Sequence, residues 1–187
     1  MGYHNKQIAK SQLQLKRPVV LVGLMGAGKT TVGRRLASQL EVDFIDSDNE
    51  IAEAAGCSIS DIFDIYGEDV FRDLEKRVMT RLLNKKACII ATGGGAFIQP
   101  HIREQILDKA TAVWLNATLD VLIERVSRRD TRPLLKTGDK KVIMQRLLEE
   151  RYPIYQQAHL HIDSNEASHE VVVDAILEGL HQWTTPS

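Results

Sequence analysis

Residues 23–30 read Gly-Leu-Met-Gly-Ala-Gly-Lys-Thr and directly follow a short apolar run, residues 19–22. Glycines at this spacing let backbone N–H groups turn inward around an anion, because no Cβ stands in the way. A helix that begins near Lys29 would direct the positive end of its dipole at the same place. The segment therefore predicts a strand, a phosphate-binding loop and a helix in succession, with Lys29 at the outer phosphates of a nucleotide and the Thr30 hydroxyl at Mg²⁺.

Short apolar runs alternate with longer segments of helical period along the rest of the chain. The runs that we expect to be strands are 19–22, 43–45, 88–91, 112–115 and 159–162. The expected helices are 29–39, 48–54, 69–84, 99–108, 119–129, 140–157 and 168–181. Four of the five runs are almost continuously apolar, as buried parallel strands are. The alternation predicts a doubly wound α/β sheet, which binds its ligands beyond the carboxyl ends of the strands.

The composition narrows the function classes. The chain has 187 residues, with 24 Lys and Arg against 25 Asp and Glu, so one domain is favoured and no basic field for nucleic acid is present. Cys57 and Cys88 form neither a disulfide framework nor a CxxC motif, which favours a reducing compartment. No segment reaches the roughly 18 apolar residues of a membrane-spanning helix. Residues 1–16 lack the hydrophobic centre of a secretory signal, so we expect a cytoplasmic protein with a mobile tail at 1–16.

Two carboxylates, Asp46 and Asp48, follow the second predicted strand. If the backbone stays extended there, the two side chains share one face, and one could serve Mg²⁺ while the other faces an acceptor hydroxyl. A helix N-cap at Ser47 or Asp48 is the alternative, which would explain one acid and not both. The third predicted strand contains no Walker-B acid, and the absence of a guanine-reading NKxD sequence argues against a GTPase.

A run of three glycines, residues 93–95, follows the third predicted strand. It permits close approach of a ligand to backbone amides, although a bare loop would have the same composition. Arg72 and Glu75 are spaced for an ion pair on one helix. That pair either lies on the surface, where it contributes little, or Glu75 orients Arg72 toward an anionic substrate.

Two further arginines stand one and two residues before a proline. Arg132 precedes Pro133, which disfavours helix in the residue before it, so we expect Arg132 in a mobile lid that closes on a transferring phosphate. Arg151 precedes Pro153, a possible helix boundary. Its side chain either takes part in the site or only balances the dipole at a helix C-terminus.

The order GLMGAGKT, FIDSD, FRDLE, TGGGA, RPLL and RYPIY resembles the shikimate kinase family, which has the nucleoside-monophosphate-kinase-like P-loop fold. The stretch 46–75 resembles the shikimate-binding region of that family almost throughout, and the resemblance extends over about residues 18 to 180. It implies a three-layer α/β fold with five parallel strands in the order 2-3-1-4-5. It also implies one domain, 17–187, with a helical substrate-binding insert at about 48–78 and a lid at about 128–141.

The resemblance also implies a reaction, in which MgATP and shikimate give shikimate 3-phosphate and ADP on the route to chorismate and the aromatic amino acids. The implied ATP-binding residues are Gly26, Ala27, Gly28, Lys29, Thr30, Thr31, Arg125 and Arg132, with Arg125 stacked on adenine. The implied ligands of one Mg²⁺ ion are Thr30 and Asp46. The implied shikimate-binding residues are Asp48, Arg72, Gly94, Gly95 and Arg151. The implied catalytic residues are Lys29, Asp48 and Arg132, where Asp48 either deprotonates the attacking hydroxyl or only orients it.

Two other functions stay open at this point. A related sugar-acid kinase, such as a gluconate kinase, would share the fold, although the RPLL, TGGGA and RYPIY combination speaks against it. A nucleotide-binding regulatory protein without turnover is disfavoured because both carboxylates and the candidate arginines are present.

The family resemblance also implies a monomer. The chain departs from the family in its tail, 1–16, and in the adenine-side loop 163–169, which lacks a proline that some members have.

Overall fold

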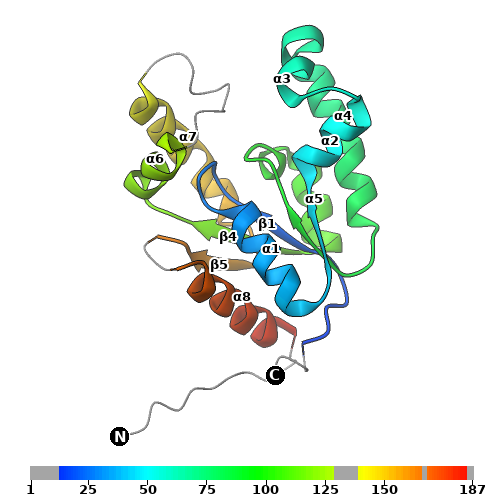
Figure 1. The fold of residues 1–187 in the computed structure, drawn as a ribbon, viewed down its shortest axis with the longest axis vertical. Helices are drawn as coiled ribbons and strands as arrows, with labels where there is room; N and C mark the ends of the chain where they lie inside the picture. The colour runs from blue at the N-terminus through cyan, green and yellow to red at the C-terminus, as the bar shows by residue number, and fades with distance from the viewer. Residues whose placement is uncertain (1–12, 129–138, 166–167, 185–187) are drawn as a thin grey trace, which may run out of the picture.

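The computed structural model describes residues 13–128, 139–165 and 168–184. Its five strands form one parallel sheet in the order β2-β3-β1-β4-β5, which confirms the expected order (Figure 1). The strands are β1 (Val19–Val22), β2 (Asp43–Asp46), β3 (Cys88–Ala91), β4 (Thr111–Asn116) and β5 (Leu160–Asp163). In the centre, Val20 of β1 is paired with Ile90 on one side and with Ala112 on the other.

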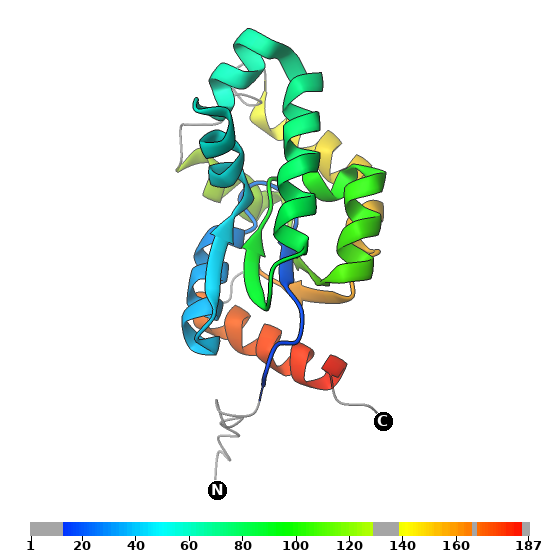
Figure 2. The same cartoon turned by 90° about the vertical axis from the view of Figure 1, so that its right-hand side faces the viewer.

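Helices cover both faces of the sheet. On one side α1 contacts α8, and on the other α5 contacts α4 and β4 (Figure 2). The helices α2, α3 and the first turns of α4 lie at the end of the molecule away from α8 (Figure 1). The α-helices are α1 (Lys29–Leu40), α2 (Ser47–Ala55), α3 (Ile59–Asp61), α4 (Gly67–Leu83), α5 (Pro100–Lys109), α6 (Leu119–Ser127), α7 (Lys140–Tyr155) and α8 (His169–Thr184). A π-helical turn, η1 (Ile62–Tyr66), precedes α4, and a 3₁₀ turn, η2 (Ala96–Ile98), precedes α5.

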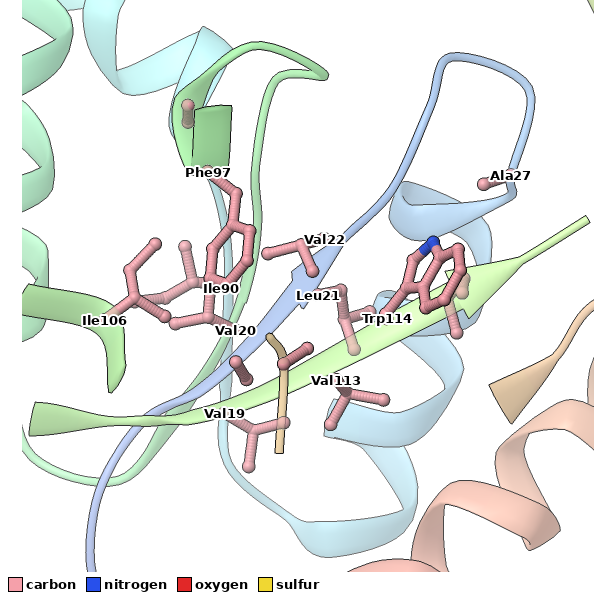
Figure 3. Close-up of a cluster of buried hydrophobic side chains, with 14 of the residues drawn as sticks. Val19, Val20, Leu21, Val22, Ala27, Ile90, Phe97, Ile106, Val113 and Trp114 are labelled. Carbon is pink, nitrogen blue, oxygen red and sulfur yellow. The ribbon is translucent and has the colours of Figure 1, made fainter. Parts of the chain in front are cut away.

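The hydrophobic core is centred on β1, whose four residues are almost fully buried. Figure 3 shows the β1 side chains packed together with Ile90, with Phe97 and Ile106 near the α5 side, and with Trp114 of β4. Burying an aliphatic or aromatic side chain of this size contributes about 1.5–3 kcal/mol. Because β1 is buried on both faces, the loop that follows it starts from the centre of the core. Among the described residues, no helix is both long and apolar enough to cross a membrane.

One local feature differs from the sequence expectation, and a second decides between two expectations. Residues 56–66 were not assigned to any element, yet α3 forms there, with a capping box in which Ser58 and Asp61 exchange hydrogen bonds. The helix expected at 140–157 forms as α7 and continues past Pro153 to Tyr155, so Pro153 is not its boundary. Pro153 lies in the last turn, where its missing N–H removes only one helical hydrogen bond, and the complete burial of Tyr155 holds that turn against the core.

The structure predicts that stability falls in mild acid because of His159. Its Nδ1 accepts the N–H of Ala112 at 3.0 Å, and burial, with the nearby charge of Arg17, lowers the pKa of His159. A protonated ring could not accept that bond, so the folded state favours neutral His159 more than the unfolded state does. This stabilisation is complete above the unfolded pKa of about 6.5 and is lost as the pH falls through the lower folded value.

Urea unfolding of the chain at pH 5 and pH 7.5 checks this expectation. We expect a smaller free energy of unfolding at pH 5, and a weaker pH dependence in His159→Asn, whose Oδ1 can still accept from Ala112 but does not titrate. An identical pH dependence in the two proteins would show that other groups are responsible.

Candidate active site

The loop between β1 and α1 is built around glycines in the left-handed region of backbone space. Gly23 has φ 140° and Gly26 has φ 84°. A Cβ at Gly23 would lie 2.8 Å from the carbonyl oxygen of Leu115, and one at Gly26 would lie 2.9 Å from Cγ2 of Val126. Both positions therefore require glycine, for space as well as for conformation.

Lys29, the first residue of α1, lies within this loop rather than in solvent. Its side chain is 8% exposed, and its Nζ donates to the carbonyl oxygens of Gly23 at 2.7 Å and Leu24 at 2.9 Å. The ammonium group is thus held across the mouth of the loop at the N-terminus of α1. A helix N-terminus and a cation at one place form a binding site for an anionic group.

Asp46 connects α1 to α2. Its Oδ2 accepts from the Thr30 hydroxyl at 3.0 Å, and its Oδ1 accepts from the N–H of Asp48, also at 3.0 Å. The condition of an extended backbone is not met, because α2 begins at Ser47, and in the alternative of a helix cap the capping residue is Asp46 and not Ser47 or Asp48. The cap itself brings Asp46 and Asp48 together, since its carboxylate binds the backbone of the second acid.

Thr30 and Asp46 fit a magnesium ion by their chemistry. A hydroxyl and a carboxylate are hard oxygen donors, and Mg²⁺ is commonly bound by one or two such groups together with waters and substrate phosphates. The described residues contain no group of three or more His, Cys, Asp or Glu side chains arranged as a metal site.

The glycine run after β3 lies beside α2 and α7. The N–H of Gly93 donates to Oγ of Ser47 at 3.3 Å, and a Cβ at Gly93 would lie only 2.6 Å from Oδ1 of Asp48. The carbonyl oxygen of Gly94 accepts from Nη1 of Arg151 at 3.0 Å. The buried Ser47 hydroxyl was missed by sequence reasoning, in which Ser47 was only a possible helix cap.

Arg72 of α4 reaches the third glycine of the run. A Cβ at Gly95 would lie 2.8 Å from Nη1 of Arg72. The guanidinium is oriented by two carboxylates, with Nη1 donating to Glu75 at 2.8 Å and Nη2 donating to Glu68 at 3.0 Å. Glu75 is 1% exposed, so the ion pair is not a surface pair, and the orienting role is the interpretation that the structure favours. Glu68 was missed, because a glutamate four residues before an arginine is common on any helix.

The charges of Arg72, Glu75 and Glu68 affect the pKa values of Arg72 and Glu75. Burial disfavours the Arg72 cation, but the hydrogen bonds and charges of Glu75 and Glu68 more than offset it and raise the pKa of Arg72. Burial raises the pKa of Glu75, and the bond from Arg72 opposes that rise. Arg72 therefore remains a cation beside the glycine run, and part of its donor capacity is left for another anion.

Arg125 lies on the opposite side of the phosphate loop, on α6. Its Nη2 donates to the carbonyl oxygen of Asn165 at 2.7 Å, and its Nη1 donates to Oγ of Ser164 at 3.3 Å. Ser164 in turn donates to the carbonyl oxygen of Ala27 at 2.9 Å and is almost fully buried. The loop after β5 is therefore linked to the phosphate loop through Ser164, a residue that sequence reasoning did not single out. Arg132 and most of the expected lid at about 128–141 lie outside the described residues.

An open cavity of about 370 Å³ lies over the phosphate loop, a size typical of ligand pockets. Nine residues predicted for the site line it: Gly26, Gly28, Lys29, Thr30, Thr31, Asp46, Asp48, Gly94 and Arg125. Five further lining residues were not among the predicted ones: Thr92, Gly93, Val126, Arg128 and His169. Of the other predicted residues that the structure describes, Ala27 is buried beneath the loop, and Arg72, Gly95 and Arg151 lie at the glycine run.

The family model described as shikimate kinase matches residues 25–181. A shikimate kinase of Novosphingobium aromaticivorans is 48% identical over 183 residues, which are 96% of this chain and 95% of that protein. One of Rhodopseudomonas palustris is 50% identical over 167 residues, which are 89% of this chain and 82% of that protein.

Solved structures of shikimate kinases are also similar to this chain. Shikimate kinase from Acinetobacter baumannii in complex with shikimate has a TM-score of 0.89 and 35% identity, and the match covers 95% of this chain and 99% of that one. A gluconokinase from Sinorhizobium meliloti 1021, with a TM-score of 0.60 and 19% identity, shares the fold alone. The family model matches residues 25–181, the relatives are similar along almost the whole chain, and the phosphate loop faces a glycine run that two arginines contact. This chain therefore belongs to the shikimate kinase family.

Proposed function

We propose that this chain transfers the γ-phosphoryl group of ATP to the 3-hydroxyl of shikimate, giving shikimate 3-phosphate and ADP. The observation that supports this best is the meeting of Asp48, Arg72 and Arg151 at the glycine run 93–95, next to the phosphate loop. An acceptor that carries both an acid and hydroxyls needs cations for its carboxylate and an anion for its hydroxyls. The two arginines and Asp48 supply those charges, and the segment 48–78 that carries two of the three is the proposed substrate-binding insert.

The phosphate loop would hold the triphosphate of ATP. Its backbone N–H groups and Lys29 would neutralise the charge on the outer phosphates. Thr30 and Asp46 would hold Mg²⁺, which when bound neutralises developing charge between the two outer phosphates. Arg125, fixed by the loop after β5, would contact the adenine end.

The chemical step is a displacement at phosphorus. The bond from the shikimate 3-oxygen to the γ-phosphorus forms, the bond from that phosphorus to the β–γ bridging oxygen breaks, and ADP leaves. The hydroxyl proton passes to the Asp48 carboxylate, which stands beside Gly93. Phosphoryl transfer depends mainly on positioning and charge neutralisation, and the arginines provide the positioning through the shikimate carboxylate.

The release of ADP, followed in a coupled assay with MgATP and either shikimate, gluconate or AMP, tests the proposed function. We expect turnover with shikimate alone, and ³¹P NMR of the product should place the phosphate on the 3-oxygen. Turnover only with gluconate or AMP would retain the kinase fold and refute the acceptor. ATP binding without turnover on any acceptor would instead support a nucleotide-binding regulatory protein.

Arg72→Ala should raise the shikimate KM more than tenfold and leave the ATP KM nearly unchanged, because a hydrogen bond to a charged group contributes about 1.5–3 kcal/mol. Arg77→Ala is the matched control, since Arg77 lies on the same helix, pairs with Asp73 and is 73% exposed. The control should keep the KM of the unaltered chain. Steady-state kinetics with each substrate varied in turn would refute the carboxylate role if the Arg72→Ala and Arg77→Ala proteins behaved alike.

We also propose that a single chain in the cytoplasm is the working unit. The family resemblance favours a monomer, and both cysteines, Cys57 and Cys88, are unpaired thiols, as is usual in a reducing compartment. Light scattering of the active protein should give the mass of one chain, 21.0 kDa. A dimer mass at assay concentration would contradict the monomer.

A further inference from the structure

Tyr155, the last residue of α7, has a role that neither the motifs nor the proposed chemistry assigned. Its side chain is completely buried, and its hydroxyl donates to the carbonyl oxygen of Gly94 at 2.5 Å. Arg151, one turn earlier on the same helix, donates from Nη1 to that same oxygen at 3.0 Å. A single carbonyl in the glycine run thus accepts two hydrogen bonds from α7.

The Tyr155 hydroxyl is the more rigid of these two donors. Its ring is stacked with Phe97 at 6.3 Å and with Trp114 at 6.1 Å between centroids, and both of those residues belong to the core (Figure 3). Burial raises the pKa of Tyr155, so the hydroxyl keeps its proton and remains a donor. Arg151 is only half-buried on a long side chain, and under the proposed function it also binds the shikimate carboxylate.

The peptide between Gly94 and Gly95 links this contact to the substrate side. The described residues contain no cis peptide bond, so the N–H of Gly95 points away from the α7 donors that hold the Gly94 carbonyl. Within the described part of the chain, no acceptor takes this N–H, and the Arg72 guanidinium lies next to Gly95. Hydrogen bonds to the carbonyl also polarise the peptide and make its N–H a stronger donor.

We propose that Tyr155 is a positioning residue for the acceptor: its hydroxyl fixes the Gly94–Gly95 peptide so that the Gly95 N–H is directed at the carboxylate bound by Arg72 and Arg151. This inference rests on the proposed function and extends it to a residue that does not touch the substrate. Neither Gly94 nor Gly95 has a side chain that restricts its backbone, so the hydrogen bonds to the Gly94 carbonyl help to fix this peptide, in addition to the turn hydrogen bonds that the carbonyls of Gly93 and Gly95 accept.

Tyr155→Phe tests the proposal, because it removes the hydroxyl and keeps the packed ring. We expect the shikimate KM to rise about fivefold to tenfold, as the loss of one hydrogen bond would cause, with kcat changed less than about twofold and the ATP KM unchanged. Tyr152→Phe is the matched control, since the Tyr152 hydroxyl on the same helix donates to the backbone carbonyl of Ala117. The control loses a comparable hydrogen bond away from the glycine run and should keep the shikimate KM.

A purely structural role predicts a different pattern. In that case both variants would lower the melting temperature and the fraction of active enzyme, and neither would change the shikimate KM, which would overturn the inference. The acceptor that the unaltered chain phosphorylates shows whether the inference about Tyr155 has failed or the proposed function has failed. If that chain used another acid, such as gluconate, the KM for that acid would take the place of the shikimate KM. If it used no acceptor, the inference would fall together with the proposed function.

Discussion

Asp48→Asn is expected to lower kcat with shikimate by about a thousandfold, within the range of general base catalysis, while the KM for ATP stays within a few-fold of normal. Asparagine is nearly isosteric and can still accept a hydrogen bond from the substrate hydroxyl, but it cannot take the proton. The helix cap should survive, because Asp48 contributes only its backbone N–H to the bond with Asp46.

A second variant, Asp48→Ala, distinguishes the proposed role of this carboxylate as a base from the alternative in which it only orients the hydroxyl. If Asp48 is the base, the Asn and Ala variants should be about equally slow, since both lack the proton acceptor. If Asp48 only orients the hydroxyl, Asp48→Asn should retain much of the turnover and Asp48→Ala should not. Asp43→Asn, at the exposed start of β2, the strand that precedes α2, is the control and should be as active as the unaltered chain. Single-turnover rates measured by quenched flow would separate chemistry from product release.

Lys29→Met should lower kcat/KM for ATP by about 10²–10³-fold, the loss seen when one preorganised donor to a developing charge is removed. Methionine keeps the length of the side chain, so the change removes the ammonium group and little of the packing. The carbonyl oxygens of Gly23 and Leu24 then lose a donor, and a cost of about 1–3 kcal/mol in stability is expected as well.

Thermal unfolding of the Lys29→Met protein should therefore accompany the kinetics, to show that the assay temperature lies below its transition. The exposed Lys76→Met on α4 is the matched control and should change neither quantity. An unchanged kcat/KM for ATP in a folded Lys29→Met protein would remove Lys29 from the phosphate site. That result would leave the loop amides and the α1 N-terminus as the source of charge stabilisation.

Local patterns were enough to predict the strands. The runs at 19–22 and 88–91 match β1 and β3 to the residue, because a buried parallel strand needs continuous apolar side chains whatever the rest of the chain does. The phosphate loop was also predictable from a local pattern, because its backbone conformation needs glycines at set positions within eight residues. The strand order came from the family resemblance and not from any periodicity.

Other features depended on contacts between distant segments. Whether Arg72 and Glu75 formed a surface pair or a buried one could not be decided from an i, i+3 spacing, because burial depends on what packs over the helix. The N-cap of α2 was assigned one or two residues late, since Asp46 is both the last residue of β2 and the partner of Thr30. A strand residue whose side chain also caps the next helix has no distinct sequence signal.

The sequence by itself therefore determined the order of the elements, the phosphate loop and the residue types of the site, because these follow from backbone requirements and apolar patterns over short segments. Only the tertiary structure decided that the glycine run 93–95 meets Asp48 of α2, Arg72 of α4 and Arg151 of α7. The same is true of the Tyr155 hydroxyl, which reaches Gly94 across 61 positions of sequence. These contacts arise when helices far apart in the chain pack at the carboxyl edge of one sheet, and that packing is a property of the whole core.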